Sequence, residues 1–215
     1  MIKAVVLDFD DTVIHTYNNF MDTAKQVSER LGVPMPLEKT IRREYGNGWK
    51  EILTATFPDA DKEEFVKAYA SINSLKIYRP IRGVNEALDL LSKKYIIGVM
   101  TGGSRNVFMN NLAKASIDFK KFSFTLTRDE IQKPKSHPEY FNLAFRELEK
   151  LGIGKEDVIF VGDSVFDCQA SLNANIHFVG VLTGPATRDE LEESGAKNII
   201  PSVMELPSFI ENNGF

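Results

Sequence analysis

Short apolar runs alternate with stretches of helical spacing along most of this chain. Parallel strands need long crossover connections, usually helices, so this alternation favours a parallel sheet. We therefore expect an α/β fold built on a doubly wound parallel sheet, with helices covering both of its faces. The strand-length runs are residues 4–7, 96–100, 122–126, 158–161 and 178–181.

The interval between the first apolar run and Pro80 breaks this alternation. It contains no convincing strand, but it does contain four segments in which apolar residues recur at helical spacing. We interpret residues 15–80 as a small helical domain inserted after the first strand, and residues 1–14 and 81–215 as the α/β core domain. The four predicted helices lie within residues 20–31, 36–46, 49–57 and 61–72.

Composition excludes several classes of protein. The chain has 26 Lys and Arg against 30 Asp and Glu, and the basic residues form no stripe, which argues against a nucleic-acid partner. Its apolar runs are far shorter than the roughly 20 residues of a membrane span. Cys168 is the only cysteine, so no internal disulfide can form, and no apolar leader precedes the first strand. We expect a cytoplasmic protein that does not bind a membrane.

Polar residues collect directly after the predicted strands. In an open parallel sheet, ligands bind beyond the carboxyl ends of the strands, so these residues are the candidates for a functional site. They are Asp8 and Asp10 after the first strand, Thr101 and Gly102 after the second, and Asp163 and Asp167 after the fourth, with Lys133 and Lys135 in the loop before Pro138.

The types of these residues indicate phosphoryl chemistry around a cation. Asp8, Asp10 and Asp163 would repel one another in one crevice unless a cation compensates or some of them protonate. An all-oxygen ligand set with room for water and phosphate suits Mg²⁺. The Thr-Gly-Gly backbone after the second strand suits a phosphoryl group, and a lysine would offset negative charge. One carboxylate could attack phosphorus while another donates a proton to the leaving oxygen.

Four segments, in order, resemble the motifs of the haloacid dehalogenase superfamily in its phosphatase branch. They are Asp8-Phe9-Asp10-Asp11-Thr12, Thr101-Gly102, Lys133-Pro134, and Gly162-Asp163-Ser164 followed by Asp167. Any one of these matches would be weak, but four in order are specific.

The resemblance implies a role for each matched residue. Asp8 would be the nucleophile that forms an aspartyl-phosphate, and Asp10 would protonate the leaving alcohol and later activate water. Asp8 and the backbone carbonyl of Asp10 would bind Mg²⁺ with Asp163, while Asp167 helps to hold that site. The phosphoryl group would contact Thr101, Gly102 and Lys133.

Two positions depart from the family pattern. The lysine segment usually reads Lys-Pro-x-Pro-x-Pro, whereas Ser136 stands here at the middle proline. The motif alignment assigns the catalytic role to Lys133 and leaves Lys135 as the alternative. Asp11 replaces the commoner glycine of the first motif, a variation also found among such phosphatases.

The insertion resembles the helical cap of phosphoglycolate phosphatases and their relatives, which closes over the substrate. A loop between its second and third predicted helices could reach the substrate through Arg43, Asn47 and Trp49. The alternative is that this loop is a surface turn with a half-buried Trp.

We therefore predict a Mg²⁺-dependent phosphatase that acts on a small phosphorylated metabolite, most like phosphoglycolate phosphatase. A pyrophosphatase or nucleotidase could use the same site, and a phosphomutase would need only a different cap environment. Two further alternatives are a metal-independent haloacid dehalogenase and a non-catalytic phosphate-binding module. The sequence leaves open whether the protein is a monomer or a homodimer.

Overall fold

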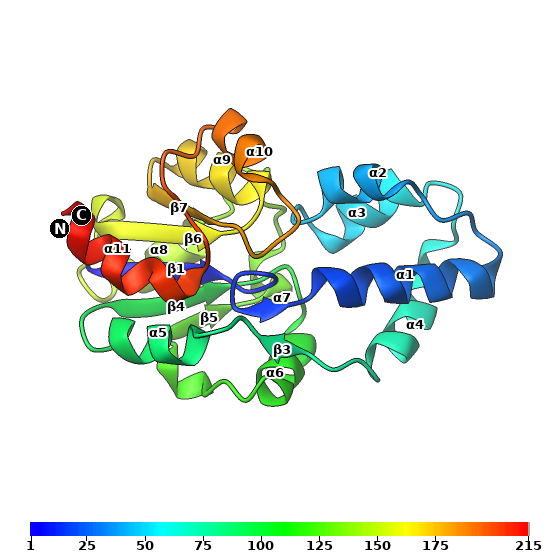
Figure 1. The fold of residues 1–215 in the computed structure, drawn as a ribbon, viewed down its shortest axis with the longest axis horizontal. Coiled ribbons are helices and arrows are strands. Elements are labelled where there is room, and N and C mark those ends of the chain that lie inside the picture. The colour runs from blue at the N-terminus through cyan, green and yellow to red at the C-terminus, as the bar shows by residue number, and fades with distance from the viewer. Residues whose placement is uncertain (215) are drawn as a thin grey trace.

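A six-stranded parallel sheet forms the centre of the protein in a computed structural model that describes residues 1–214. The strand order is β5-β4-β1-β6-β7-β8, so β1 lies inside the sheet, between β4 and β6 (Figure 1). The expected doubly wound α/β fold is confirmed. The strands are β1 (Ala4–Asp8), β4 (Ile96–Met100), β5 (Phe124–Leu126), β6 (Val158–Gly162), β7 (His177–Val181) and β8 (Ile199–Ile200).

Side chains of the central strands alternate between two hydrophobic layers. Val5 and Leu7 belong to one layer, and Ala4 and Val6 to the other, as the two-residue period of a strand requires. Helices α5, α6 and α11 pack on the first layer, and α8, α9 and α10 on the second. The helices of the core are α5 (Val84–Leu91), α6 (Arg105–Lys114), α7 (Arg128–Ile131), α8 (Asn142–Glu149), α9 (Val165–Ala174), α10 (Arg188–Glu193) and α11 (Leu206–Asn213); short 3₁₀ turns occupy Phe119–Lys121, Lys155–Asp157 and Val203–Glu205.

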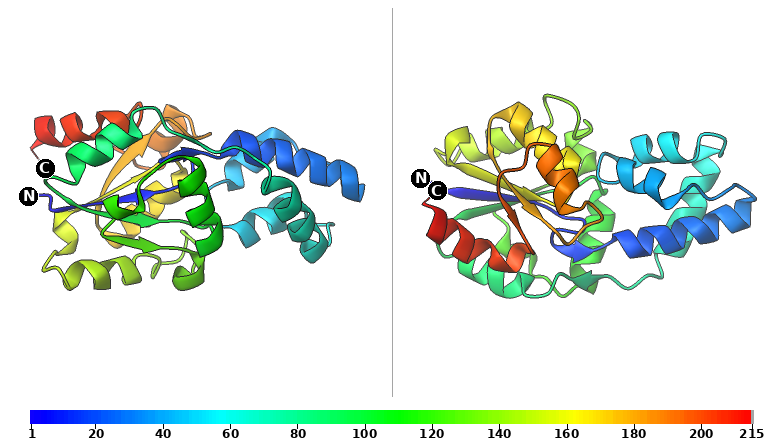
Figure 2. Two further views of the ribbon diagram at one scale, coloured as in Figure 1. Left: turned by 90° about the horizontal axis from the view of Figure 1, so that it is seen from below. Right: turned by 45° about the horizontal axis from the view of Figure 1, so that its top comes forward.

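The segment after β1 forms a helical insertion with its own hydrophobic core. Buried side chains such as Phe20, Ile41 and Phe65 pack together there, separately from both layers around the sheet. The insertion lies beyond one end of the sheet, and Figure 2 shows this from two further directions. Its helices are α1 (Tyr17–Leu31), α2 (Glu38–Glu44), α3 (Trp49–Thr56) and α4 (Lys62–Asn73).

Local capping explains where these helices begin and end. Gly32 ends α1 in the left-handed conformation, which glycine adopts without steric cost. The Asp61 side chain accepts a hydrogen bond from the Glu64 N–H and so caps α4. The second helix is shorter than expected, because it begins at Glu38 rather than at Pro36 and ends before Gly46.

The chain enters and leaves the insertion through a small antiparallel ladder that the sequence did not indicate. Here β2 (Ile14–His15) pairs with β3 (Arg79–Pro80). The domain boundaries that we propose, residues 15–80 for the insertion and residues 1–14 and 81–215 for the core, remain a prediction.

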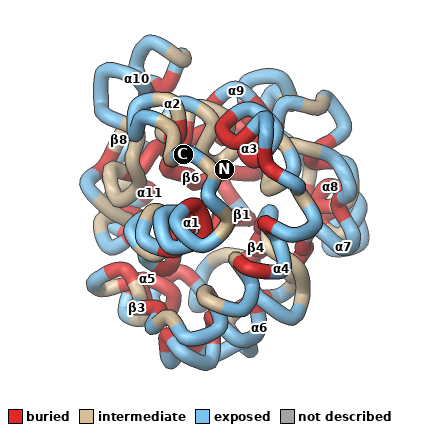
Figure 3. Tube along the Cα trace, turned by 90° about the vertical axis from the view of Figure 1, so that its right-hand side faces the viewer, coloured by how far each residue is buried: buried red, intermediate tan, exposed pale blue. Residues whose placement is uncertain are grey.

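The burial pattern follows from these layers. Figure 3 looks onto the molecule from the side of the insertion: β1 and β6 run through the buried interior, whereas α6 and α10 turn exposed surfaces outward. Within residues 1–214, no helix combines the length and apolar character needed to cross a membrane.

Candidate active site

Three strand ends bring the predicted site residues together. Asp8 is the last residue of β1, while Thr101 directly follows β4 and Asp163 directly follows β6. Because β1 lies between β4 and β6, the chain changes direction across the sheet at this point. Such a switch point is where open α/β sheets bind ligands.

Asp8, Asp163 and Asp167 form a buried group of carboxylates that could hold a metal ion. Each offers an oxygen, and these oxygens all lie within 4.8 Å of one another. None of the three residues is more than 3% exposed. Oxygen donors at this spacing fit a hard divalent cation such as Mg²⁺, which compensates the repulsion between them.

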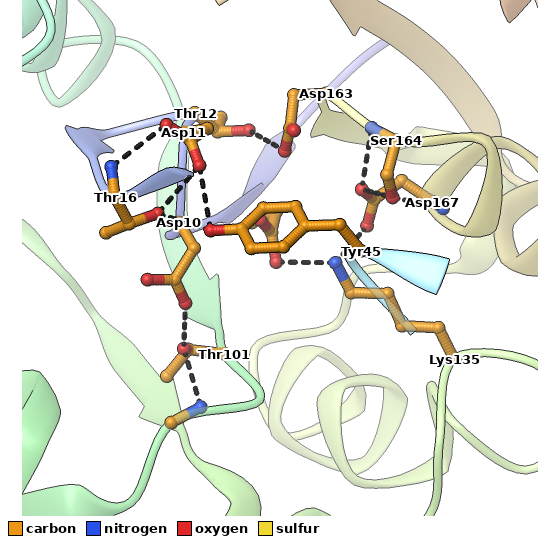
Figure 4. A network of polar contacts seen from close by, with 12 residues as sticks. Asp10, Asp11, Thr12, Thr16, Tyr45, Thr101, Lys135, Asp163, Ser164 and Asp167 are labelled. Carbon is orange, nitrogen blue, oxygen red and sulfur yellow. Dashed lines mark hydrogen bonds and ion pairs between the residues drawn. The ribbon is translucent and has the colours of Figure 1, made fainter. Parts of the chain in front are cut away.

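Lys135, and not Lys133, reaches this group. The Lys135 Nζ lies 2.7 Å from Asp167 Oδ1 (Figure 4). It also lies 2.9 Å from Asp8 Oδ1. The Lys133 side chain is 45% exposed, and its Nζ lies 3.8 Å from the exposed Glu139 carboxylate. The structure therefore does not place Lys133 where the motif alignment expected it, and Lys135 occupies that position.

The path of the loop explains this difference. Helix α7 ends at Ile131, and the next residue, Gln132, has a left-handed φ of 49°; the chain then leaves Lys133 on the surface. A turn closed by the His137 N–H on the Pro134 carbonyl follows, and Lys135 within it is buried. A buried ammonium is stable only beside opposite charges, which the aspartates supply.

Burial and charge together set the ionisation of this group. Burial raises the pKa of Asp8 well above its usual value, although the Lys135 charge opposes that shift. Burial acts against the charge of Lys135, but Asp167 and Asp8 outweigh it and hold the pKa of the ammonium well above its usual range. Lys135 is therefore a fixed positive charge at neutral pH.

Asp10 is held by the residue that follows β4. The Thr101 hydroxyl donates to Asp10 Oδ2 at 3.0 Å and accepts from the Gly103 N–H at 3.0 Å. Burial, followed by the charge of Asp11, raises the pKa of Asp10 to about 6, while the Thr101 hydrogen bond opposes the shift. A carboxyl with a raised pKa can carry a proton closer to neutrality than an ordinary one.

Asp167 is oriented by a reciprocal cap at the start of α9. The Ser164 hydroxyl accepts from the Asp167 N–H, and Asp167 Oδ2 accepts from the Ser164 N–H at 3.1 Å. This arrangement leaves Asp167 Oδ1 facing Lys135.

Asp11 connects the site to the insertion, a role that sequence reasoning missed. Its carboxylate accepts hydrogen bonds from the N–H and hydroxyl of Thr16, the N–H of Tyr17 and the hydroxyl of Tyr45. Its φ of 54° is left-handed, a conformation in which Gly is favoured and Asp is tolerated. The aspartate at a position that more often holds glycine was the available signal; no local signal pointed to Tyr45.

Two further contacts constrain Asp163. The Thr12 hydroxyl donates to Asp163 Oδ1 at 3.3 Å. A Cβ at Gly184, in the loop after β7, would lie 1.8 Å from Asp163 Oδ2. Only glycine allows the backbone to approach so closely, so Gly184 also belongs to the site. The sequence analysis did not recognise this residue.

A cavity of about 370 Å³ lies between the core and the insertion. Asp8, Asp10, Gly102, Asp163 and Lys135 line its core side. Two of the three cap residues expected at the substrate, Asn47 and Trp49, line the opposite side. Arg43 does not, because its side chain is 77% exposed and pairs with Glu44.

The comparison with known proteins agrees with this geometry. Residues 5–181 match the family model described as haloacid dehalogenase-like hydrolase. The chain belongs to this family. The family match thus confirms the resemblance found in the sequence of this hydrolase. The structure confirms the expected helical insertion after β1.

Relatives of this hydrolase carry different substrate names. It is 25% identical over 221 residues to a phosphoglycolate phosphatase of Nitrosococcus oceani, covering 97% of this chain and 96% of that protein. It is 25% identical over 193 residues to an N-acetylmuramic acid 6-phosphate phosphatase of Pseudomonas aeruginosa, covering 85% of this chain and 83% of that one. Its fold matches a hydrolase from Pseudomonas syringae with a TM-score of 0.84, at 20% identity, covering 98% of this chain and 99% of that chain.

Proposed function

We propose that this enzyme is a Mg²⁺-dependent phosphatase that hydrolyses a small phosphomonoester through an aspartyl-phosphate. The observation that carries the proposal is the position of Asp8. Its carboxylate lines the cavity, contacts the buried Lys135 ammonium and belongs to the group of three carboxylates that could hold a metal.

In the proposed reaction, an Asp8 carboxylate oxygen forms a bond to phosphorus as the bond between phosphorus and the ester oxygen breaks. Asp10 gives its proton to the departing alcohol oxygen. Asp10 then takes a proton from water as the water oxygen attacks phosphorus, which releases phosphate and restores Asp8. Lys135 offsets the negative charge on the phosphoryl oxygens, in the role that the motif alignment gave to Lys133.

The remaining site residues support these steps. Thr101 holds the Asp10 carboxyl, and Gly102 offers backbone to the phosphoryl oxygens from an open edge of the cavity. The Mg²⁺ ligands in this proposal are Asp8, the Asp10 carbonyl and Asp163, with Asp167 holding the site. When bound, Mg²⁺ would neutralise the carboxylates and polarise the phosphoryl group.

The substrate in this proposal is a small phosphorylated metabolite in the cytoplasm. Phosphoglycolate is the reference candidate, because that name recurs among the relatives. Pyrophosphate and nucleotides stay in the test panel because the same phosphoryl site could accept them.

The test compares wild-type enzyme with Asp8→Asn, using ethyl phosphate and 4-nitrophenyl phosphate with Mg²⁺ or excess EDTA. We expect the wild-type enzyme to release phosphate only with Mg²⁺. In Asp8→Asn the rate of phosphate release should fall below about one-thousandth of the wild-type rate, because an amide cannot attack phosphorus. Asp59→Asn is the matched control, since Asp59 is an exposed residue of the insertion outside the cavity.

Three outcomes would overturn the proposal. Activity of Asp8→Asn close to wild type would remove Asp8 as the nucleophile. Halide release from a haloacid without metal would indicate a dehalogenase. Phosphate binding without any turnover would indicate a binding module.

A further inference from the structure

The two sides of the cavity differ in chemistry. The core side carries the charged groups, including Asp8, Asp10, Asp163 and Lys135. Every described residue that the insertion contributes to the lining is uncharged. The side chains of Phe20, Trp49, Ile52, Val66 and Tyr69 form what we call the apolar wall.

Three rings of the apolar wall pack against one another. The centroids of Trp49 and Tyr69 are 4.5 Å apart, and Phe20 lies 6.1 Å from Trp49 and 5.9 Å from Tyr69. The rings are tilted or edge-on to one another, so they hold a fixed arrangement that presents ring surface to the cavity. A flat ring in the substrate could bury its own apolar surface there.

Among the described residues, the apolar wall offers no cation for a second anionic group on the substrate, because both cations that line the cavity, Lys135 and Arg128, belong to its core side. Lys135 is engaged by Asp8 and Asp167. Arg128 follows β5 and its backbone N–H donates to the Gly103 carbonyl, so this arginine lies beside the loop proposed for the phosphoryl group and not on the apolar wall.

The two arginines in the last turn of α2 do not supply a positive charge to the apolar wall either. The Arg42 guanidinium lies 3.0 Å from Glu190 on the core, and Arg43 pairs with Glu44. A carboxylate held against the apolar wall would therefore lose hydration without gaining a cationic partner.

Asn47 provides a separate indication that an organic group occupies this side. Its Oδ1 is buried and has no hydrogen-bond partner among the described residues. Buried polar atoms are rarely left unpaired, and Asn47 lines the cavity, so a donor on a bound ligand would satisfy it.

We infer that the preferred substrate is the phosphate ester of an uncharged alcohol that carries a flat ring, and not of a small carboxylate such as glycolate. The inference rests on the proposed phosphatase function and assigns the leaving group to the apolar wall. The cavity volume of about 370 Å³ lies within the range of roughly 300–1,000 Å³ typical of ligand pockets.

The experiment compares kcat/KM for benzyl phosphate, ethyl phosphate and phosphoglycolate. All three release an alcohol whose oxygen is bonded to a saturated carbon, so the comparison reports binding of the organic group more than its leaving ability. We expect benzyl phosphate to exceed ethyl phosphate about 10- to 100-fold, as burial of a phenyl ring allows, and phosphoglycolate to fall below ethyl phosphate.

Two variants place the effect in the cavity. Trp49→Ala should lower the ratio of benzyl to ethyl phosphate at least about fivefold, because it removes the largest ring of the apolar wall. Val66→Arg should raise the ratio of phosphoglycolate to benzyl phosphate, because it adds a cation to the same wall. The control Leu37→Ala changes a 66% exposed residue of the insertion outside the cavity and should preserve the wild-type ratios.

The outcomes separate this inference from the proposed function. If ethyl and 4-nitrophenyl phosphates are hydrolysed but phosphoglycolate is preferred to benzyl phosphate, the inference is wrong and the phosphatase proposal stands. If no ester is hydrolysed with Mg²⁺, the phosphatase proposal itself fails. If Trp49→Ala does not fold, the comparison of the three esters with wild-type enzyme decides the question, and Val66→Arg serves as the second variant.

Discussion

Replacing Lys135 by Met tests the assignment of the charged lysine most directly. Methionine keeps much of the length of the side chain and removes its charge. The lysine is 5% exposed and is the cation that contacts both Asp8 and Asp167. In the variant these carboxylates would stand beside Asp163 without that compensation.

The contact distances set the size of the effect. At an effective dielectric constant of about 20, opposite charges about 2.8 Å apart attract by roughly 6 kcal/mol, but desolvation cancels much of this gain. Removing one partner of a buried pair typically costs about 3–5 kcal/mol. We expect a loss of that size in the free energy of unfolding without Mg²⁺ and a smaller loss with Mg²⁺, which would replace part of the missing charge.

Activity should fall more sharply than for any surface lysine. A charged group that stabilises the transition state contributes a factor of about 10²–10³ to kcat. The matched control is Lys133→Met, which breaks an exposed pair at 3.8 Å and should cost no more than about 1 kcal/mol.

The assay combines urea unfolding, with and without Mg²⁺, and kcat for ethyl phosphate measured on folded protein. The reasoning would be refuted if Lys133→Met lost as much activity as Lys135→Met. It would also be refuted if Lys135→Met kept kcat within about threefold of wild type.

Two further predictions concern the carboxyl that protonates the leaving group and the contact between the insertion and the core. Asp10→Asn should lower kcat/KM, which reports transfer of the phosphoryl group to Asp8, by about 10²–10⁴ for ethyl phosphate and much less for 4-nitrophenyl phosphate, because nitrophenolate needs no proton to leave; a loss of kcat/KM confined to the nitrophenyl ester would contradict its role as the acid. Gly46→Ala should destabilise the protein by about 1–3 kcal/mol and lower kcat/KM, because its φ of 97° is left-handed and a Cβ would lie 2.7 Å from the Ser164 Cβ. Gly32→Ala separates the two causes, since its φ of 66° is also left-handed but no atom lies within 4 Å of the added Cβ; equal losses of kcat/KM in both variants would exclude the contact with Ser164 as the reason.

Much of the fold could be predicted because its signals are local. Apolar runs and helical spacing identified the main strands and the helices of the insertion. Strand β8 was not predicted, because two residues are too few to show the two-residue period of a strand. The paired strands β2 and β3 were not predicted for the same reason. Observed helix ends differ by a few residues from the predicted ones where the chain does not begin or end the helix at the Pro or Gly used for the prediction.

The candidate site was predictable only in part. The sequence by itself determined that Asp8, Thr101 and Asp163 follow strands, and parallel pairing then brings those strand ends to one edge. The tertiary structure decided that Lys135 rather than Lys133 reaches Asp8, and that Arg43 faces away from the cavity.

The physical reason is that the two kinds of information act over different ranges. Periodicity and capping depend on neighbours within a few residues, so they can be recognised in the chain itself. The contact between Tyr45 and Asp11, and the charge balance around Lys135, join segments 32 or more residues apart. Such contacts depend on loop paths and packing, which only the folded molecule determines.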